Sequence, residues 1–158
     1  MKDILVRDDT RNIIICRVSV DMILDLRHRL LRAGLPKDSA NFPGDEISST
    51  WHLAVFNLSR NDALPISCAS FMLNSYKDEH AWQLRGMATE AGYQGKGFGG
   101  ELLRCGETLI VVDSRVRLFW CNARVPAIRF YEKHGWKVDS EEFEIPTAGP
   151  HRRMFKRL

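Results

Sequence analysis

The chain has 158 residues, of which 44% are hydrophobic and 27% are charged, and its formal net charge is +3. This length predicts one domain over residues 1–158 with a sizeable core, and so mild a charge does not by itself indicate a nucleic-acid partner. No apolar run approaches the roughly 18 residues of a membrane-spanning helix, and no secretory pattern follows Met1. We therefore expect a cytoplasmic protein without a membrane partner.

The cysteines and histidines lack the spacing of a metal site. Cys16, Cys68, Cys105 and Cys121 are far apart, have apolar neighbours and include no Cys-x-x-Cys pair. They are typical of small buried side chains rather than of disulfides or metal ligands. The five histidines also show no ligand spacing, so we predict no metal.

The first part of the chain predicts a strand followed by a helix. The β-branched run 13–18 is typical of a strand. Apolar residues then recur at helical spacing over 22–31. Arg27, Arg29 and Arg32 are expected on the solvated side of this helix, from which one of them could reach a ligand.

The middle of the chain predicts a long loop and three antiparallel strands. Residues 37–50 are polar and rich in turn-forming residues, and a connection of this length is typical of a binding loop. The strands are expected at 51–58, 65–73 and 81–89, with turn residues between the first two.

The last part of the chain predicts alternating helices and strands. In chain order we expect a helix over 97–112, a buried strand at 116–121, a strand-to-helix turn at 122–126, a short helix ended by Gly135, a strand from 136 with 141–145 as its continuation, and a final edge strand at 151–158. These elements predict an α/β (α+β) fold: one mixed, mostly antiparallel sheet of about six to seven strands, flanked by helices.

Four glycines within six positions mark the most unusual stretch, at Gly95, Gly97, Gly99 and Gly100. So many glycines are costly in backbone entropy unless the backbone must approach a ligand closely. They lie where a helix begins, and the unpaired N–H groups of a helix start bind anions. Lys96 adds a positive charge. The stretch therefore predicts a phosphate-binding loop.

Three phosphate-binding motifs compete for this stretch. A Walker loop fails because Phe98-Gly99 stands where Lys-Ser/Thr is required. A dinucleotide fingerprint matches as Gly95-x-Gly97-x-x-Gly100, and 109–113 would then be a second strand ending in an acid, but the turn before the glycines is too long for it. The third candidate, Gln94-x-x-Gly97-x-Gly99, resembles the pyrophosphate loop of the GNAT superfamily of N-acetyltransferases.

A second motif supports this resemblance. The string from Asn122 to Trp136 resembles the second conserved segment of the superfamily, in which a strand ends in Asn and a short helix carries Ala-x-x-Phe-Tyr before Gly-Phe. Ala127, Phe130 and Tyr131 occupy those positions here. The resemblance covers residues 51–138 well, and the first fifty residues only by the order of their elements.

The resemblance implies acetyl-CoA (coenzyme A) as co-substrate and a GNAT-like fold. The main chain of residues 87–89 would pair with the pantetheine arm beside a bulge, and the N–H groups of residues 95–100 would hold the diphosphate. The cofactor-binding residues would be Met87, Ala88, Thr89, Gln94, Gly95, Lys96, Gly97, Phe98, Gly99, Gly100, Asn122, Ala127, Phe130 and Tyr131.

The resemblance also implies catalytic roles in acyl transfer by direct attack of an amine. Tyr131 would be the general acid that protonates the departing thiolate. Asn122 would contact the pantetheine, orient the site or cap the following helix. For the general base, Glu90 follows the donor-binding strand and His52 has the most suitable ordinary pKa, with His151 a weaker candidate. No base is assigned, since a water serves in many members.

The acceptor stays open at this stage, as do the acyl-chain preference and the oligomeric state. It is a small-molecule amine or a protein amine, and Asp45 and Glu46 in the polar loop would suit a cationic one. A homodimer is compatible with the late edge strands. A non-catalytic coenzyme A sensor is the alternative from another class. A dinucleotide-binding oxidoreductase comes next, and a nucleic-acid module comes last.

Overall fold

The structure is a computed structural model and describes residues 2–158. Its strands and α-helices are β1 (Lys2–Asp8), β2 (Ile13–Val18), α1 (Leu24–Leu31), β3 (Trp51–Asn57), β4 (Pro65–Leu73), β5 (Trp82–Thr89), α2 (Phe98–Ser114), β6 (Leu118–Arg124), α3 (Ile128–Lys133), β7 (Lys137–Val138), β8 (Phe143–Ile145) and β9 (Gly149–Arg157). Four short 3₁₀ turns lie at Val20–Met22, Lys37–Ala40, Ala91–Tyr93 and Val125–Ala127.

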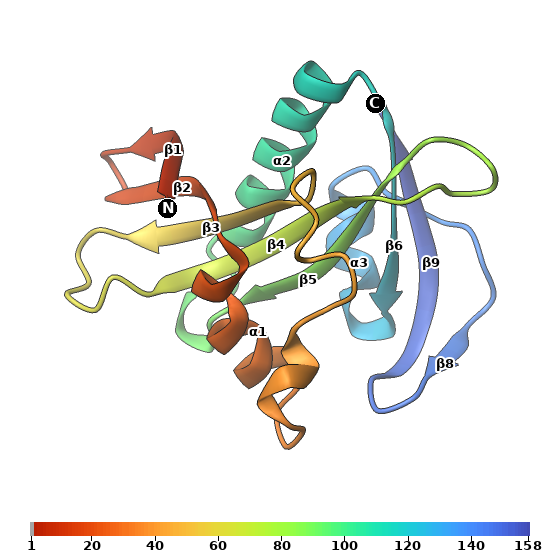
Figure 1. The fold of residues 1–158 in the computed structure, drawn as a ribbon, viewed down its shortest axis with the longest axis horizontal. Helices are drawn as coiled ribbons and strands as arrows, with labels where there is room; N and C mark the ends of the chain where they lie inside the picture. The colour runs from red at the N-terminus through yellow and green to blue at the C-terminus, as the bar shows by residue number, and fades with distance from the viewer. Residues whose placement is uncertain (1) are drawn as a thin grey trace.

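One sheet runs through the molecule in the order β1-β2-β3-β4-β5-β6-β9-β7, with β8 paired to β9 (Figure 1). Neighbouring strands are antiparallel except for β5 and β6, which are parallel. The parallel pair is short, because only Trp82↔Phe119 and Gln83↔Trp120 are in register. Beyond these two pairs β5 and β6 diverge, and the sheet opens between them.

Helices cover both faces of the sheet. α1 packs on one face, while α2 and α3 lie on the other (Figure 1). Because side chains alternate along each strand, the two larger hydrophobic cores form on opposite faces: Leu53 and Phe71 pack with Leu102 of α2, whereas Cys16 packs with Leu26 of α1. Burial of each large apolar side chain stabilises the fold by about 1.5–3 kcal/mol.

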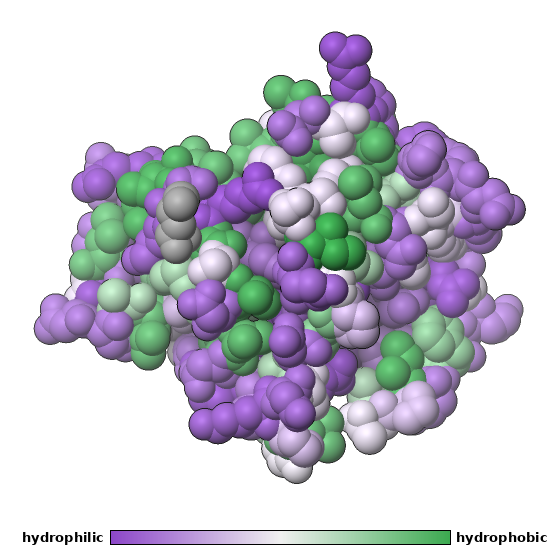
Figure 2. All heavy atoms as spheres, in the orientation of Figure 1, coloured by the Kyte–Doolittle hydropathy of each residue, from purple (hydrophilic) through white to green (hydrophobic). Residues whose placement is uncertain are grey.

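The face that carries α1 is largely hydrophilic (Figure 2). Hydrophilic residues surround a hollow that opens between the loop after α1 and the region of β8 and β9 (Figure 2). None of the helices between residues 2 and 158 is long and apolar enough to cross a membrane.

The expected fold class is confirmed, and the three strands expected over 51–89 are present within a residue of their predicted ends. The sheet has nine strands, so the expected six to seven were too few. β1 was not predicted, because it is a largely exposed edge strand with little apolar alternation. The region 136–145 forms two separate short strands, each paired to β9.

The helix expected over 97–112 is confirmed as α2. Ile110 is buried and Val112 is 76% exposed, as helical spacing requires, so the rejected dinucleotide motif lacks its second strand. Two local predictions were wrong. β9 is an internal strand between β6 and the β7 and β8 strands, because its apolar residues fill both faces. Asn122 was expected in the turn at 122–126 but lies within β6, because the pairing of β6 with β9 continues to Arg124.

Candidate active site

The divergence of β5 and β6 leaves a cavity of about 320 Å³. Its walls come from the end of α1, the loop after α1, β5, β6, α3 and the β8–β9 connection. The lining residues are Leu31, Arg32, Phe42, Pro43, Gln83, Leu84, Arg85, Gly86, Met87, Cys121, Asn122, Ala123, Arg124, Ala127, Tyr131, Ile145, Ala148 and His151.

β5 carries a bulge at the wall of this cavity. Its register with β4 passes from Cys68↔Ala88 to Ser70↔Arg85, so β5 has one residue more than its partner. Gly86 lies in the bulge with φ +61°, in the left-handed region that favours glycine. A Cβ at this position would lie 2.6 Å from Nε of Arg27. The expected bulge is therefore present, and backbone conformation and packing both require its glycine.

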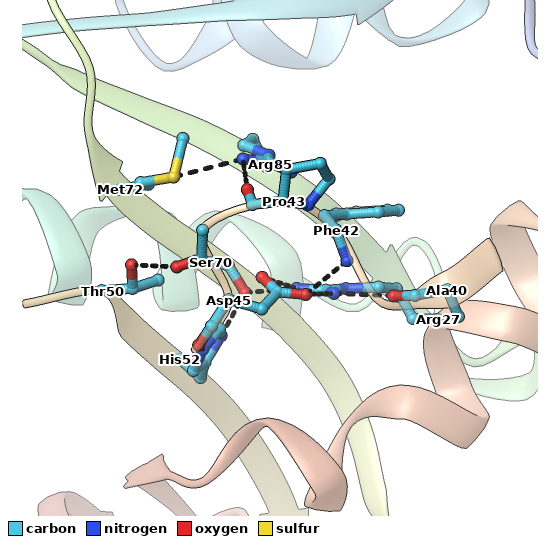
Figure 3. A network of polar contacts seen from close by, with 12 residues as sticks. Arg27, Ala40, Phe42, Pro43, Asp45, Thr50, His52, Ser70, Met72 and Arg85 are labelled. Atoms are coloured by element: carbon cyan, nitrogen blue, oxygen red, sulfur yellow. Dashed lines mark hydrogen bonds and ion pairs between the residues drawn. The ribbon is translucent and has the colours of Figure 1, made fainter. Parts of the chain in front are cut away.

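A buried ion pair lies under the bulge (Figure 3). Arg27 is fully buried, and its Nη1 donates to Asp45 Oδ2 at 2.5 Å and to the carbonyl of Ala40 at 2.8 Å. Its Nη2 donates to Ser70 Oγ at 2.7 Å. The expectation that Arg27 lies on the solvated side of its helix was wrong, because Asp45 neutralises its charge in the interior. Asp45 is consequently engaged within the fold and does not face a ligand.

His52, a candidate base, belongs to the same network (Figure 3). Its Nε2 lies 3.0 Å from the carbonyl oxygen of Asp45 and its Nδ1 lies 2.7 Å from Ser70 Oγ. A carbonyl can only accept, so Nε2 carries the proton and Nδ1 accepts from the Ser70 hydroxyl. Burial lowers the pKa of His52, which favours this neutral ring. His52 is outside the cavity lining and anchors the loop after α1.

Glu90, the other leading candidate base, follows β5 and forms a two-point ion pair. Arg29 Nη1 donates to Oε1 at 2.9 Å, and Nη2 donates to Oε2 at 3.0 Å. These hydrogen bonds lower the pKa of Glu90. A carboxylate stabilised in this way is a weaker base than a free one, and Glu90 lies outside the cavity lining.

The glycine-rich stretch forms the start of α2, as predicted. Gln94 Nε2 donates to the carbonyl of Thr89 at 2.9 Å and ties the loop to the end of β5. Gly95 and Gly97 have φ values of +74° and +85°, both in the left-handed region. The first-turn N–H groups of this 17-residue helix have no partner within the helix, so the segment is suited to bind an anion. Lys96 is exposed beside it.

Other residues of the glycine stretch join α2 to α3. Phe98 is buried in the larger core. A Cβ on Gly99 would lie 3.6 Å from the ring of Phe130, and one on Gly100 would lie 2.5 Å from the ring of His134. These two glycines therefore let the start of α2 approach α3 closely, which brings the anion-binding segment next to the helix that carries Tyr131.

Two polar groups of the cavity wall lack protein partners. Tyr131 is buried, and none of residues 2–158 forms a hydrogen bond with its hydroxyl. Burial and the neighbouring Cys121 raise the pKa of Tyr131 well above its usual value of 10. Within the same part of the chain, Asn122 Oδ1 is buried without a hydrogen-bond partner. Buried polar groups are normally paired, so Asn122 Oδ1 is suited to contact a ligand, and the Tyr131 hydroxyl on the same cavity wall keeps its donor for one.

The structure brings together only part of the predicted site. Met87, Asn122, Ala127 and Tyr131 line one cavity, while the glycine stretch begins the adjacent helix. Sequence reasoning missed Arg85 and Arg124 as cavity residues. Their signal was an arginine in a strand whose other residues are all buried or half-buried. Between residues 2 and 158, no three His, Cys, Asp or Glu side chains are grouped to hold a metal ion.

Comparison with solved structures places the fold among acetyltransferases. ElaA of Escherichia coli matches with a TM-score of 0.73 at 16% identity, over 92% of this chain and 98% of that one. An aminoglycoside 6'-N-acetyltransferase complexed with coenzyme A matches with a TM-score of 0.68 at 14% identity, over 90% and 96% of the two chains. At such identities the likeness concerns the fold.

Sequence comparison gives the family. A family model described as an acetyltransferase (GNAT) domain matches residues 53–138. An uncharacterized N-acetyltransferase of Bacillus subtilis (strain 168), YitI, is 36% identical over 144 residues, which cover 89% of this chain and 93% of YitI. The chain belongs to the GNAT family of acetyltransferases and is an acyltransferase, which confirms the resemblance of its two motifs.

Proposed function

We propose that the protein transfers the acetyl group of acetyl-CoA to a primary amine by direct attack, within the cavity between β5 and β6. The observation that carries the proposal is the wall of this cavity beside the start of α2, where Asn122 Oδ1 is buried without a partner and Tyr131 presents a hydroxyl that no residue of 2–158 engages. The family and the coenzyme A complex of one fold neighbour support acetyl-CoA as the donor.

The residues at the opening fit coenzyme A. β5 pairs with β4 along its length but with β6 only at Trp82 and Gln83, so one edge of its backbone is free from Leu84 onward. Free strand edges bind extended partners through main-chain hydrogen bonds, as the amides of a pantetheine arm require. The N–H groups from Gly95 to Gly100 and the charge of Lys96 would hold the diphosphate. Asn122 Oδ1 would accept an N–H of the arm.

Two groups of the chain serve the transfer itself. When bound, the donor supplies an activated thioester. A backbone N–H of the bulge beside Met87 would polarise its carbonyl. Tyr131 would donate its proton to the sulfur of the leaving group, and its raised pKa keeps the phenol protonated at neutral pH. Cys121 is not the nucleophile in this scheme, because burial raises the pKa of its thiol.

Removal of the amine proton is assigned to water in this proposal. His52 uses both ring nitrogens in the buried network, and Glu90 is paired with Arg29. Since both lie outside the cavity lining, a role for either as base would also run through a bridging water.

The donor assignment is tested by thermal unfolding in the presence of acetyl-CoA, coenzyme A or NADH. A ligand at about a hundred times its Kd stabilises a protein by about 2.7 kcal/mol, which raises the Tm by several degrees. We expect acetyl-CoA and coenzyme A to raise the Tm and NADH to leave it unchanged. A shift with NADH alone would refute the proposal and favour a dinucleotide-binding protein.

A further inference from the structure

The cavity is strongly basic. Three arginines contribute to its lining, Arg32 from the end of α1, Arg85 from β5 and Arg124 from β6, together with His151 of β9. No residue of the lining is an acid. Among residues 2–158, no carboxylate forms an ion pair with any of the three arginines. The nearby Asp45 is already paired with Arg27, so the fold leaves this positive charge uncompensated.

Each arginine is positioned by the fold yet keeps donors to spare. Arg85 Nη1 donates to the carbonyl of Pro43 at 2.6 Å, next to Phe42 (Figure 3). Arg124 Nη2 donates to the carbonyl of Leu31 at 3.0 Å. The guanidinium groups of Arg32 and Arg85 each lie 5.2 Å from the centroid of the Phe42 ring. A guanidinium has five N–H donors, so most of them remain for a ligand.

Close like charges are unfavourable in a half-buried site. Burial and the charges of Arg124 and Arg27 lower the pKa of Arg32. Burial also lowers the pKa of Arg85, and the charge of Arg27 acts in the same direction, although the charges of Asp45 and Glu46 oppose this effect. A bound anion would offset the repulsion among these arginines, so the arrangement favours the anion-bound state over the empty one.

We propose that the acceptor amine carries a carboxylate, which binds among Arg32, Arg85 and Arg124, so that the acceptor class is amino acids and related small amino carboxylates. Arginine pairs with carboxylates through two parallel hydrogen bonds, which also orient the ligand. The cavity volume of about 320 Å³, shared with the end of the donor, matches an acceptor of small size. The cationic acceptor suggested by Asp45 does not fit, because Asp45 is buried against Arg27.

This inference rests on the proposed function and leaves the carboxylate unchanged in the reaction. The amine nitrogen forms a bond to the carbonyl carbon of the thioester, and the carbon–sulfur bond breaks. One proton leaves the amine for water, Tyr131 gives a proton to the sulfur, and water returns a proton to the Tyr131 phenolate. The products are an N-acetylated amino acid and coenzyme A.

The direct test is titration calorimetry with the protein saturated with coenzyme A. The two members of each matched ligand pair are titrated separately, and their Kd values are compared. The pairs are leucine and 3-methylbutylamine, phenylalanine and phenethylamine, and lysine and cadaverine, which differ only in the carboxylate. We expect at least one amino acid to bind about tenfold or more tightly than its decarboxylated partner. If no amino acid binds more tightly than its partner, the inference is wrong.

Variants locate the carboxylate. Arg32→Gln, Arg85→Gln and Arg124→Gln should each weaken binding of the preferred amino acid about tenfold and leave the decarboxylated partner unaffected. The side chain of Arg32 makes no hydrogen bond within residues 2–158, so Arg32→Gln removes none from the fold and keeps the test valid even if another variant fails to fold. Arg7→Gln, at an exposed arginine of β1, is the control and should bind like the wild type. Undiminished binding in all three cavity variants would overturn the inference.

Two further results separate this inference from the proposed function. If acetyl-CoA raises the Tm and amines are acetylated without preference for a carboxylate, the inference fails and the acetyltransferase function stands. A tenfold preference for succinyl-CoA over acetyl-CoA that disappears in the arginine variants would assign the carboxylate to the acyl donor and overturn the inference. Absence of coenzyme A binding would instead contradict the proposed function.

Discussion

At the scale of single residues, Tyr131 is the side chain whose replacement separates chemistry from binding. Its hydroxyl has no partner among residues 2–158, so Tyr131→Phe removes no hydrogen bond of the fold. We expect kcat to fall about 100-fold, at the lower end of general acid catalysis because a thiolate leaves readily. The Tm and the Kd for acetyl-CoA should be unchanged. An unchanged kcat would exclude the acid role.

His52 makes the stability of the fold depend on pH. Burial lowers its pKa below 6.5, so the folded state favours the neutral ring, and the unfolded state binds the proton more readily. The free energy of unfolding should therefore hold steady above about pH 6.5 and decrease as the pH falls below that value toward the folded-state pKa.

Urea denaturation at several pH values between 5 and 8 measures this effect. In His52→Gln the decrease below pH 6.5 should become smaller, because the titrating ring is gone. The pKa of His134 is also lowered by burial, yet His134 lies outside the network, so His134→Gln serves as the matched comparison. If His52→Gln keeps the wild-type pH dependence, the ring does not titrate in the way described.

The individual site residues were predictable only where a motif carried them. Tyr131 and Asn122 were found because their string resembles a family segment, and both line the cavity. The pairing of Arg27 with Asp45 could not be predicted, since the two lie 18 positions apart and Asp45 is in a loop without periodicity. The helical spacing that assigned Arg27 to the solvated side does not reveal a charge neutralised by a distant loop.

At the scale of elements, the bulge of β5 connects two parts of the site. It lies between the free edge of β5, which is proposed to bind the donor, and the buried polar network around Arg27. Gly86→Ala would force a side chain into the left-handed region and place its Cβ 2.6 Å from Arg27 Nε and 3.0 Å from the ring of Phe42. We expect it to lower the free energy of unfolding by about 2–5 kcal/mol, from backbone strain and overpacking together. Activity should fall as well, because the bulge would move.

Gly34→Ala is the control for this change. Gly34 also has a positive φ, +82°, but nothing lies within 4 Å of a Cβ built there. It should lower the free energy of unfolding by only about 1 kcal/mol, from backbone strain. Equal losses in the two variants, measured by urea denaturation, would show that contact with Arg27 and Phe42 does not matter.

Elements were predictable where burial gives a clear pattern. β3, β4 and β5 are apolar runs separated by loops rich in turn residues, and their ends were predicted within a residue. β1 was missed because most of its residues are exposed. The run 109–113 was ambiguous, since β-branched residues favour a strand in isolation while the periodicity of α2 places them in a helix.

At the scale of the whole molecule, function depends on the place where the sheet opens. Two register pairs hold β5 to β6, and everything assigned to the transfer lies beyond them. The resemblance predicted that residues 87–89 bind the donor, and these residues lie in the part of β5 that borders the opening. Its basic lining was not predictable, because it is assembled from α1, β5 and β6, which only the folded chain brings together.

The most direct test of the account is the rate of coenzyme A release from acetyl-CoA, measured with the purified protein over a panel of primary amines and amino acids. We predict release that depends on the acceptor, saturates with its concentration and falls about 100-fold in Tyr131→Phe. Saturable acetyl-CoA binding without acceptor-dependent release across the panel would contradict the account and indicate a coenzyme A sensor.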